Sequence, residues 1–198
     1  MPIEIEAKMK VESFEGVLGA LREKGGVELG SWVETDSFFD TRDRALLAAD
    51  KGLRLRVAVD LKMKVATALL THKGPVGHGA LKKRQETQSG VADAESMARL
   101  LEQLGFVQWL KYQKRRESWK MGDCRVELDE IPHLGRFVEI EGPSEAAVMG
   151  VREKLGLAGL TLLKASYVAM LTAYLQERGE STTEILLSPD PSGIFRAG

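Results

Sequence analysis

This sequence of 198 residues contains a single cysteine and no long apolar stretch. One cysteine, Cys124, excludes an intramolecular disulfide and is typical of a reducing compartment. No segment approaches the roughly 20 apolar residues that a membrane-spanning helix needs. The N-terminus also lacks the apolar segment of a signal peptide. We therefore expect a cytoplasmic protein with no membrane partner.

The chain has almost no net charge and few histidines. Its 28 Lys and Arg residues nearly balance 29 Asp and Glu residues, which leaves a formal net charge of -1. This balance gives no general attraction to nucleic acid, and we expect no nucleic-acid partner. The three histidines, His72, His78 and His133, are too scattered to predict a zinc site, and we expect them at the surface.

Charged and apolar residues alternate along much of the chain. In residues 3–12, Glu4, Glu6 and Lys8 occupy every second position between Ile, Ala and Met. A period of two predicts a strand with one charged and one apolar face. The same signal predicts further strands at 32–40, 52–57, 66–73, 80–89, 106–121, 125–129 and 137–141.

Four segments have the apolar spacing of helices. They cover residues 14–24, 93–104, 144–155 and 165–178. No linker interrupts the chain, so we expect residues 1–178 to form one domain. Residues 179–198 are rich in Ser, Thr, Pro and Gly and are expected to be a flexible tail. About eight strands joined mostly by short turns indicate an α+β fold with an antiparallel sheet.

The charged strand faces differ in sign from one strand to another. Acidic or basic pairs two residues apart are Glu4 and Glu6, Arg54 and Arg56, Lys114 and Arg116, Glu127 and Asp129, and Glu139 and Glu141. On one strand alone such a face would normally be solvated, but solvent faces tend to mix both signs with neutral polar residues. A closed barrel brings every face onto one interior, where acids could hold cations and bases an anion. We therefore predict a charged interior and an apolar outside covered by helices.

The charged motifs also follow one another in a distinctive order, beginning with the ExExK pattern of residues 4–8. The later motifs are Asp36-x-Phe38-Phe39-Asp40, Leu53-Arg54-Leu55-Arg56, Thr71-His72-Lys73-Gly74-Pro75, Arg84-x-Glu86, Lys114-x-Arg116, Glu127-Leu128-Asp129-Glu130, Leu134-Gly135-x-Phe137-Val138-Glu139-Ile140-Glu141 and Ser166-Tyr167. From residue 3 to about residue 175, this pattern resembles the CYTH superfamily of triphosphate tunnel metalloenzymes. The resemblance implies an eight-stranded, antiparallel, closed β-barrel that forms a tunnel with flanking helices.

The resemblance also implies roles for the charged residues. One wall would bind Mg²⁺ or Mn²⁺ through the carboxylates of Glu4, Glu6, Glu86, Glu127, Asp129, Glu139 and Glu141. The other wall would bind a triphosphate through Lys8, Arg54, Arg56, Lys73, Arg84, Lys114, Arg116 and Lys164. Lys73, Arg56 and Glu6 would serve catalysis. These assignments suit the preference of hard ions for oxygen and of phosphate for Arg and Lys.

Two kinds of reaction are compatible with such a tunnel. In a triphosphatase, water attacks the terminal phosphorus of inorganic, thiamine or nucleoside triphosphate. In a class IV adenylate cyclase, the ribose 3′-hydroxyl attacks the α-phosphorus of ATP and pyrophosphate leaves. We favour hydrolysis, although Phe38 replaces a tyrosine that often helps the lysine equivalent to Lys73 activate water in the triphosphatases.

A third alternative is a non-catalytic binder of polyphosphate or nucleotide. The acidic wall argues against it, because an anion receptor gains nothing from carboxylates. The like charges within each wall should repel one another when the tunnel is empty. We therefore expect strain that bound metal and triphosphate relieve. Members of the family are often dimers, and the resemblance therefore also implies a homodimer.

Overall fold

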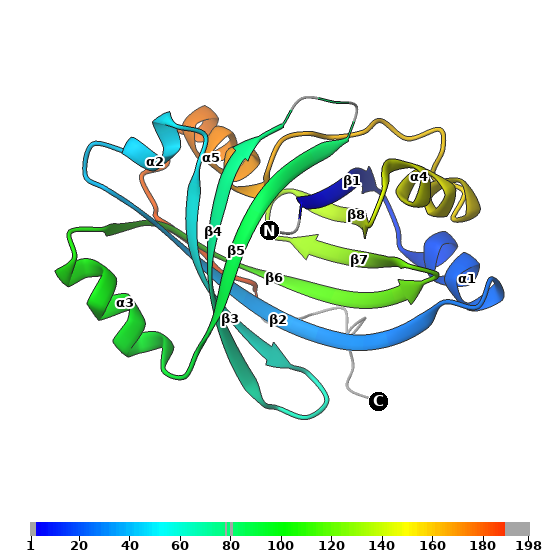
Figure 1. The fold of residues 1–198 in the computed structure, drawn as a ribbon, viewed down its shortest axis with the longest axis horizontal. Helices are drawn as coiled ribbons and strands as arrows, with labels where there is room; N and C mark the ends of the chain where they lie inside the picture. The colour runs from blue at the N-terminus through cyan, green and yellow to red at the C-terminus, as the bar shows by residue number, and fades with distance from the viewer. Residues whose placement is uncertain (1–2, 78, 80, 189–198) are drawn as a thin grey trace.

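A computed structural model of the protein describes residues 3–77, 79 and 81–188 (Figure 1). The strands in these ranges are β1 (Ile3–Val11), β2 (Val27–Asp40), β3 (Gly52–Asp60), β4 (Ala66–Val76), β5 (Lys82–Val91), β6 (Val107–Met121), β7 (Cys124–Ile131), β8 (Gly135–Gly142) and β9 (Glu184–Ile185). The helices are α1 (Glu15–Glu23), α2 (Ala45–Ala48), α3 (Ala94–Gln103), α4 (Glu145–Lys154) and α5 (Tyr167–Arg178). Within the described residues, no helix is long and apolar enough to cross a membrane.

The strands β1 to β8 close into a barrel. Their order is β2-β3-β4-β5-β1-β8-β7-β6, and β2 pairs back with β6 to complete the circle. Every pairing within this circle is antiparallel. The predicted α+β fold with an eight-stranded antiparallel barrel is thus confirmed.

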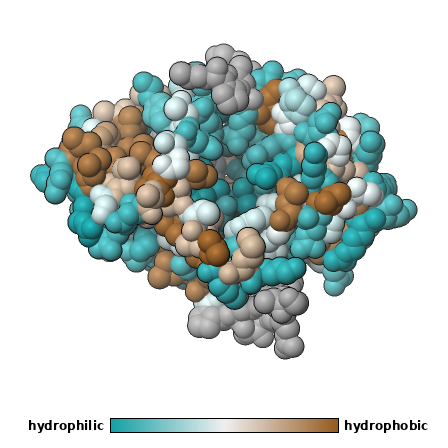
Figure 2. All heavy atoms as spheres, turned by 60° about the horizontal axis from the view of Figure 1, so that its bottom comes forward, coloured by the Kyte–Doolittle hydropathy of each residue, from teal (hydrophilic) through white to brown (hydrophobic). Residues whose placement is uncertain are grey.

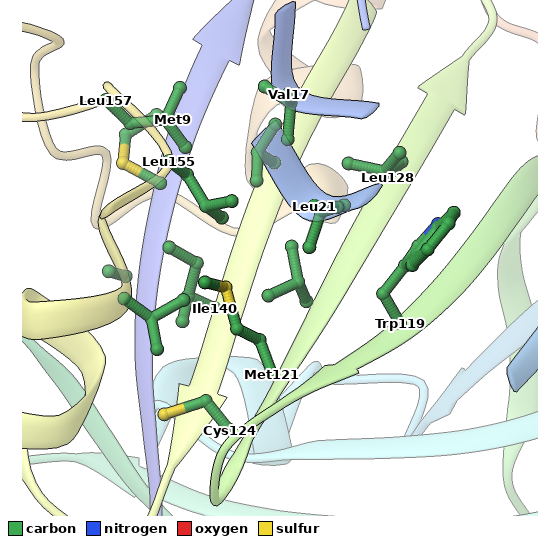
Figure 3. Packing of buried hydrophobic residues seen from close by; sticks show 14 of the residues in the cluster. Met9, Val17, Leu21, Trp119, Met121, Cys124, Leu128, Ile140, Leu155 and Leu157 are labelled. Atoms are coloured by element: carbon green, nitrogen blue, oxygen red, sulfur yellow. The ribbon is translucent and has the colours of Figure 1, made fainter. Parts of the chain in front are cut away.

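The apolar faces of the strands point outward and pack on the helices. In β1, Ala7 and Met9 join a buried cluster with residues of α1 and α4, whereas Glu6 and Lys8 face the interior. Figure 3 shows this cluster between the helices and the sheet. Two smaller apolar clusters lie beneath α5 and α3. The barrel therefore buries its apolar side chains outside and its charges inside, as the alternation predicts.

The elements differ from the sequence predictions mainly at their ends. β2 begins at Val27, five residues before the expected start, and β4 continues to Val76. The short helix α2 was not expected; the buried Asp40 carboxylate accepts hydrogen bonds from the N–H groups of Leu46 (2.9 Å) and Leu47 (3.0 Å). A side chain six or seven residues away thus stabilises this turn, which apolar spacing alone cannot indicate.

The segment 179–198, expected to be a flexible tail, contains one short strand within its described residues. Within it, β9 pairs in parallel with β6 at Lys111 and Tyr112, beyond the end of the pairing between β6 and β7. Ile185 is buried in the cluster beneath α5. The composition of the tail suggested no ordered structure because two paired residues are too few to show a period. Residues 189–198 lie outside the described residues.

Candidate active site

A cavity of about 590 Å³ occupies the inside of the barrel. Figure 2 shows a hollow in the surface with hydrophilic residues inside it. Charged residues from all eight barrel strands line the cavity: Glu4, Glu6, Lys8, Glu34, Arg54, Arg56, Lys73, Lys82, Arg84, Glu86, Lys114, Arg116, Arg125, Glu127, Glu139 and Glu141. The predicted charged interior is present.

The signs of charge are partly separated around the barrel. Most carboxylates lie on the three neighbouring strands β1, β8 and β7, and most cations lie on β3, β4 and β5 on one side and on β6 on the other. The arrangement differs from two opposed walls in one respect. Glu34 and Asp36 on β2 stand between the arginines of β3 and the cations of β6.

The arginines of β3 are held by the carboxylates of β2. Arg56 donates to both oxygens of Asp36, with Nε 2.6 Å from Oδ1 and Nη2 2.7 Å from Oδ2. Burial alone would raise the pKa of the Asp36 carboxyl, but the guanidinium groups of Arg56 and Arg54 hold it well below its usual value. Asp36 therefore stays ionised and fixes the direction of Arg56.

One carboxylate oxygen marks the point where three cations meet. Glu34 Oε2 lies 2.9 Å from Arg56 Nη1, 3.2 Å from Lys114 Nζ and 3.9 Å from Arg116 Nε. Burial would raise the pKa of Glu34, but Arg56 and Lys114 lower it to about 2. The same oxygen is buried and makes no hydrogen bond within the described part of the chain. At this position the three cations stabilise an anionic oxygen by their charge, and no hydrogen bond from the described residues fixes it.

The cations of β6 also bind carboxylates behind the cavity surface. Arg116 Nε donates to Asp129 Oδ1 at 2.6 Å, and Lys114 Nζ lies 3.1 Å from Asp129 Oδ2. Arg116 also donates to Glu139 Oε2 at 2.6 Å. Asp129 is fully buried and does not line the cavity. In this structure its contacts are those of a residue that positions the two cations, whereas the sequence predicted a metal ligand.

The lysines of β1, β4 and β5 that line the cavity also form ion pairs. Lys82 Nζ donates to Glu6 Oε2 at 2.8 Å, and Lys8 Nζ lies 3.1 Å from Glu139 Oε1. Lys73 donates to Glu86 and lies 3.8 Å from Glu4 Oε2. Burial and the nearby Arg54 guanidinium lower the pKa of Lys73. Each of these lysines thus has a carboxylate beside it. The repulsion between like charges that was predicted for the empty tunnel is therefore offset at these cations.

Three carboxylates remain costly to ionise. Burial and a hydrogen bond with Glu86 raise the pKa of Glu4 to about 8. Burial raises the pKa of Glu127 to about 7, and it also raises the pKa of Glu141. All three line the same part of the cavity, on β1, β7 and β8. On these three strands, the neighbouring Lys and Arg side chains do not offset the cost of ionising these three buried carboxylates.

These carboxylates fit a divalent metal ion by their chemistry. They offer only oxygen ligands, as Mg²⁺ and Mn²⁺ prefer, and Glu6 Oε1 is buried without a hydrogen-bond partner in the described structure. Across residues 3–77, 79 and 81–188, no three Asp, Glu, His or Cys side chains converge as they stand on one ion position. The residues therefore suit the ion by their chemistry, although as they stand they do not surround one ion position.

Two of the predicted phosphate ligands lie at or beyond the edge of the cavity. Arg84 lines the cavity but donates to the carbonyl oxygens of Gly74 and Asp50 at its rim. Lys164 is exposed, does not line the cavity and donates to the carbonyl oxygen of Gly79 at 2.7 Å. The remaining predicted phosphate ligands lie together inside.

Three charged residues in or behind the cavity wall were not predicted as site residues: Glu34, Asp36 and Lys82. Each lies on a predicted strand, but its partners depend on which strands pair. Tyr112 stacks on Phe38 at 5.9 Å between ring centres, which places a tyrosine beside the position where the family tyrosine is absent. Tyr167, at the start of α5, lies under Lys8 Nζ at 4.1 Å.

Residues outside the cavity were mostly placed correctly. His72 and His133 are exposed as expected, and His78 lies outside the described residues. Cys124 is buried at the start of β7. Burial raises the pKa of its thiol, which does not favour reactivity.

Comparison with known proteins relates this cavity to one family. Residues 2–167 match the model of the CYTH domain. Adenylate cyclase CyaB of Aeromonas hydrophila is 31% identical over 83% of this chain and 86% of that protein. A protein of Methanocaldococcus jannaschii named as a candidate adenylate cyclase is 26% identical over 89% of this chain and 99% of that protein.

Solved structures show the same fold. A protein of Pyrococcus horikoshii OT3 superposes with a TM-score of 0.75 and 26% identity, over 86% of this chain and 99% of that chain. A Hippeastrum protein is described as a candidate adenylyl cyclase with a dominant triphosphatase activity. It superposes with a TM-score of 0.65 and 18% identity, over 91% and 97% of the two chains. At that identity the likeness concerns the fold alone.

Proposed function

Because this chain belongs to the CYTH domain family, we propose that it is a divalent-metal-dependent enzyme that hydrolyses a triphosphate inside its tunnel. The names of its relatives include adenylate cyclases, and one protein of the same fold has a dominant triphosphatase activity. Both reactions act on a triphosphate. Which phosphorus is attacked distinguishes them.

The observation that carries this proposal is the convergence of Arg56, Lys114 and Arg116 on Glu34 Oε2. Guanidinium and ammonium groups stabilise phosphate oxygens by charge and by hydrogen bonds. A phosphate group would meet the same cations that this carboxylate oxygen now meets. Since Asp36 and Asp129 hold the arginines from behind, the cations are already directed before a ligand arrives.

The acidic side of the cavity would hold the metal. Glu4, Glu6 and Glu141 are the leading ligands, with Glu127 and Glu139 beside them. A divalent ion, when bound, would add positive charge beside the phosphate oxygens and the developing negative charge of the leaving group. The same charge would favour ionisation of Glu4 and Glu127, whose protonated forms are otherwise favoured by burial.

The residues of the chain then bind and orient the reacting groups. Phosphoryl transfer depends on in-line positioning and charge stabilisation more than on a covalent partner. Arg56 would hold the phosphate undergoing attack, and Lys73, which lines the cavity beside Glu4 and Glu86, would orient the attacking water. Tyr112, which lines the cavity and stacks on Phe38, is a candidate to assist in place of the tyrosine that is absent at position 38.

Adenylate cyclisation is the second candidate, and the names of the relatives favour it. The test is an analysis of products with Mg²⁺ or Mn²⁺ and, in separate reactions, tripolyphosphate, thiamine triphosphate and ATP. Free phosphate without cyclic nucleotide would support hydrolysis, whereas cyclic AMP with an equal amount of pyrophosphate would support the cyclase. Arg56→Ala should abolish turnover, while Arg99→Ala, on the exposed face of α3, should not. Wild-type protein that binds triphosphate without turnover would contradict both reactions.

A further inference from the structure

Apolar side chains also line the cavity. On β2, Trp32 lines it two residues before Glu34. On the neighbouring strands it is lined by Ala58 of β3, which pairs with Glu34, and by Leu69 of β4, which pairs with Arg56. Leu69 is 37% exposed although it lines the cavity. Apolar side chains do not bind phosphate, so they suit another part of a ligand.

The backbone is shaped to accommodate Trp32. Gly30 lies at a β-bulge in β2 and has a φ of +140°, a region that other residues rarely adopt. A Cβ at this position would lie 2.8 Å from Cη2 and 3.1 Å from Cζ2 of Trp32. The benzo ring of Trp32 therefore lies directly over Gly30, and a larger residue would displace it.

The two tryptophans that line the cavity differ in their contacts. In the described ranges no aromatic ring stacks on Trp32, no Lys or Arg lies over its ring, and its indole N–H makes no hydrogen bond. Trp109 is engaged: Arg44 lies 4.3 Å from its ring centre and Phe38 packs on its edge. Within these ranges, Trp32 is therefore the tryptophan whose ring is available to a ligand.

The position of Trp32 relates it to the anion site. It pairs across the sheet with Arg116 and precedes Glu34 by two residues, which is about 7 Å along a strand. A ligand with its phosphates at Arg56, Lys114 and Arg116 could thus extend its organic group over the indole. Aromatic side chains bind planar bases by stacking with little dependence on their sequence or substituents.

We propose that Trp32, supported by Gly30, binds the planar nitrogen heterocycle of an organic triphosphate. The inference rests on the proposed function, because it assumes that phosphates occupy the centre of the cavity. It selects organic triphosphates over tripolyphosphate as the preferred ligands. Nucleoside and thiamine triphosphates share this chemistry, and the hydroxyl of Thr67, which lines the cavity opposite Ala58, is a polar group that can discriminate between them.

The first test compares specificity constants for ATP, thiamine triphosphate and tripolyphosphate. Trp32→Leu should lower kcat/KM for the preferred organic triphosphate about ten-fold relative to tripolyphosphate, through KM, and Trp32→Phe should restore most of this preference. Trp109→Phe, at the other tryptophan that lines the cavity, should leave the ratio unchanged. Equal losses for organic and inorganic substrates in Trp32→Leu would overturn the inference.

The second test does not depend on turnover. Titration with ATP or thiamine triphosphate, in the presence of EDTA, should quench tryptophan fluorescence in the wild type and in Trp109→Phe but not in Trp32→Phe. Quenching with no hydrolysis or cyclisation would refute the proposed function and support the role of Trp32. Hydrolysis with equal quenching in Trp32→Phe and wild type would leave the proposed function intact and refute the role of Trp32.

Discussion

Asp36 and Arg56 form a two-pronged ion pair across β2 and β3, in which a fully buried carboxylate holds a guanidinium group at the cavity surface. Arg54 Nη1 lies 3.8 Å from the same carboxylate. Asp36 thus supports both cations of the Leu-Arg-Leu-Arg segment without lining the cavity itself. Removing one partner of a buried pair leaves an uncompensated charge, which is costly.

We therefore expect Asp36→Asn to lower the free energy of unfolding by about 3–5 kcal/mol. Urea denaturation measures the change. Glu95→Gln serves as the control, because its ion pair with Arg99 on α3 is exposed and should contribute less than about 1 kcal/mol. Equal and small effects of the two substitutions would show that the buried pair is not needed for folding.

Glu4→Gln should separate stability from activity. The raised pKa of Glu4 means that its ionised form is disfavoured in the metal-free protein, and Gln has the shape of the protonated acid without its charge. At about pH 8.5 we expect the metal-free variant to melt at a higher temperature than wild type, and we expect its kcat to fall at least about 100-fold. Differential scanning fluorimetry and product release measure the two effects. Unchanged kcat would exclude Glu4 from the metal site.

The stability of the metal-free protein should depend on pH in two directions. Glu4 and Glu127 have pKa values raised from 4.5 to about 8 and about 7, so their contribution is present below pH 4.5 and is lost as the pH rises toward 8. Burial raises the pKa of Glu34 and Glu86, but their hydrogen-bond and cationic partners lower both to about 2, so their contribution is lost as the pH falls below 4.5. The melting temperature should therefore be highest near about pH 5.

Melting curves in EDTA between about pH 3 and pH 9 test this dependence. The double substitution Glu4→Gln and Glu127→Gln should flatten the fall on the alkaline side and leave the fall on the acidic side. A melting temperature that rises steadily up to pH 8 in wild type would contradict the raised pKa values.

Metal and triphosphate together should stabilise the folded protein. At a ligand concentration about 100 times its Kd, binding adds about 2.7 kcal/mol to the free energy of unfolding. We expect a higher melting temperature with Mg²⁺ and tripolyphosphate than with either alone, and the metal effect should increase with pH because its ligands must be ionised. The Glu4→Gln variant should lose most of the metal effect. No shift with both ligands present would argue against a joint site.

Much of the barrel could be predicted because alternation identifies a strand face by itself. Glu6 and Lys8 on one side and Ala7 and Met9 on the other are enough to orient β1. The partner of each charge depends instead on register across strands. Alternation indicates that Asp129 faces inward, but only the register shows that Lys114 and Arg116 lie beside it.

The loops were less predictable for the same physical reason. Lys164 was expected in the site only from the family resemblance, and it lies in a connection before α5, where no alternation fixes its direction. No sequence motif indicated the proposed position of an organic group. The packing of the Trp32 ring over Gly30 depends on the β-bulge at Gly30, which the sequence alone does not predict.

The pairing that closes the barrel has a consequence for folding. β2 joins β6 from Val27 opposite Lys120 to Asp40 opposite Val107, so the contacts span 67 to 93 residues of chain. Contacts of such sequence separation slow folding, since a long loop must be closed before they form. During synthesis β2 must remain without this neighbour until β6 has emerged, and its acidic residues meet their cationic partners on β6 only at that late step.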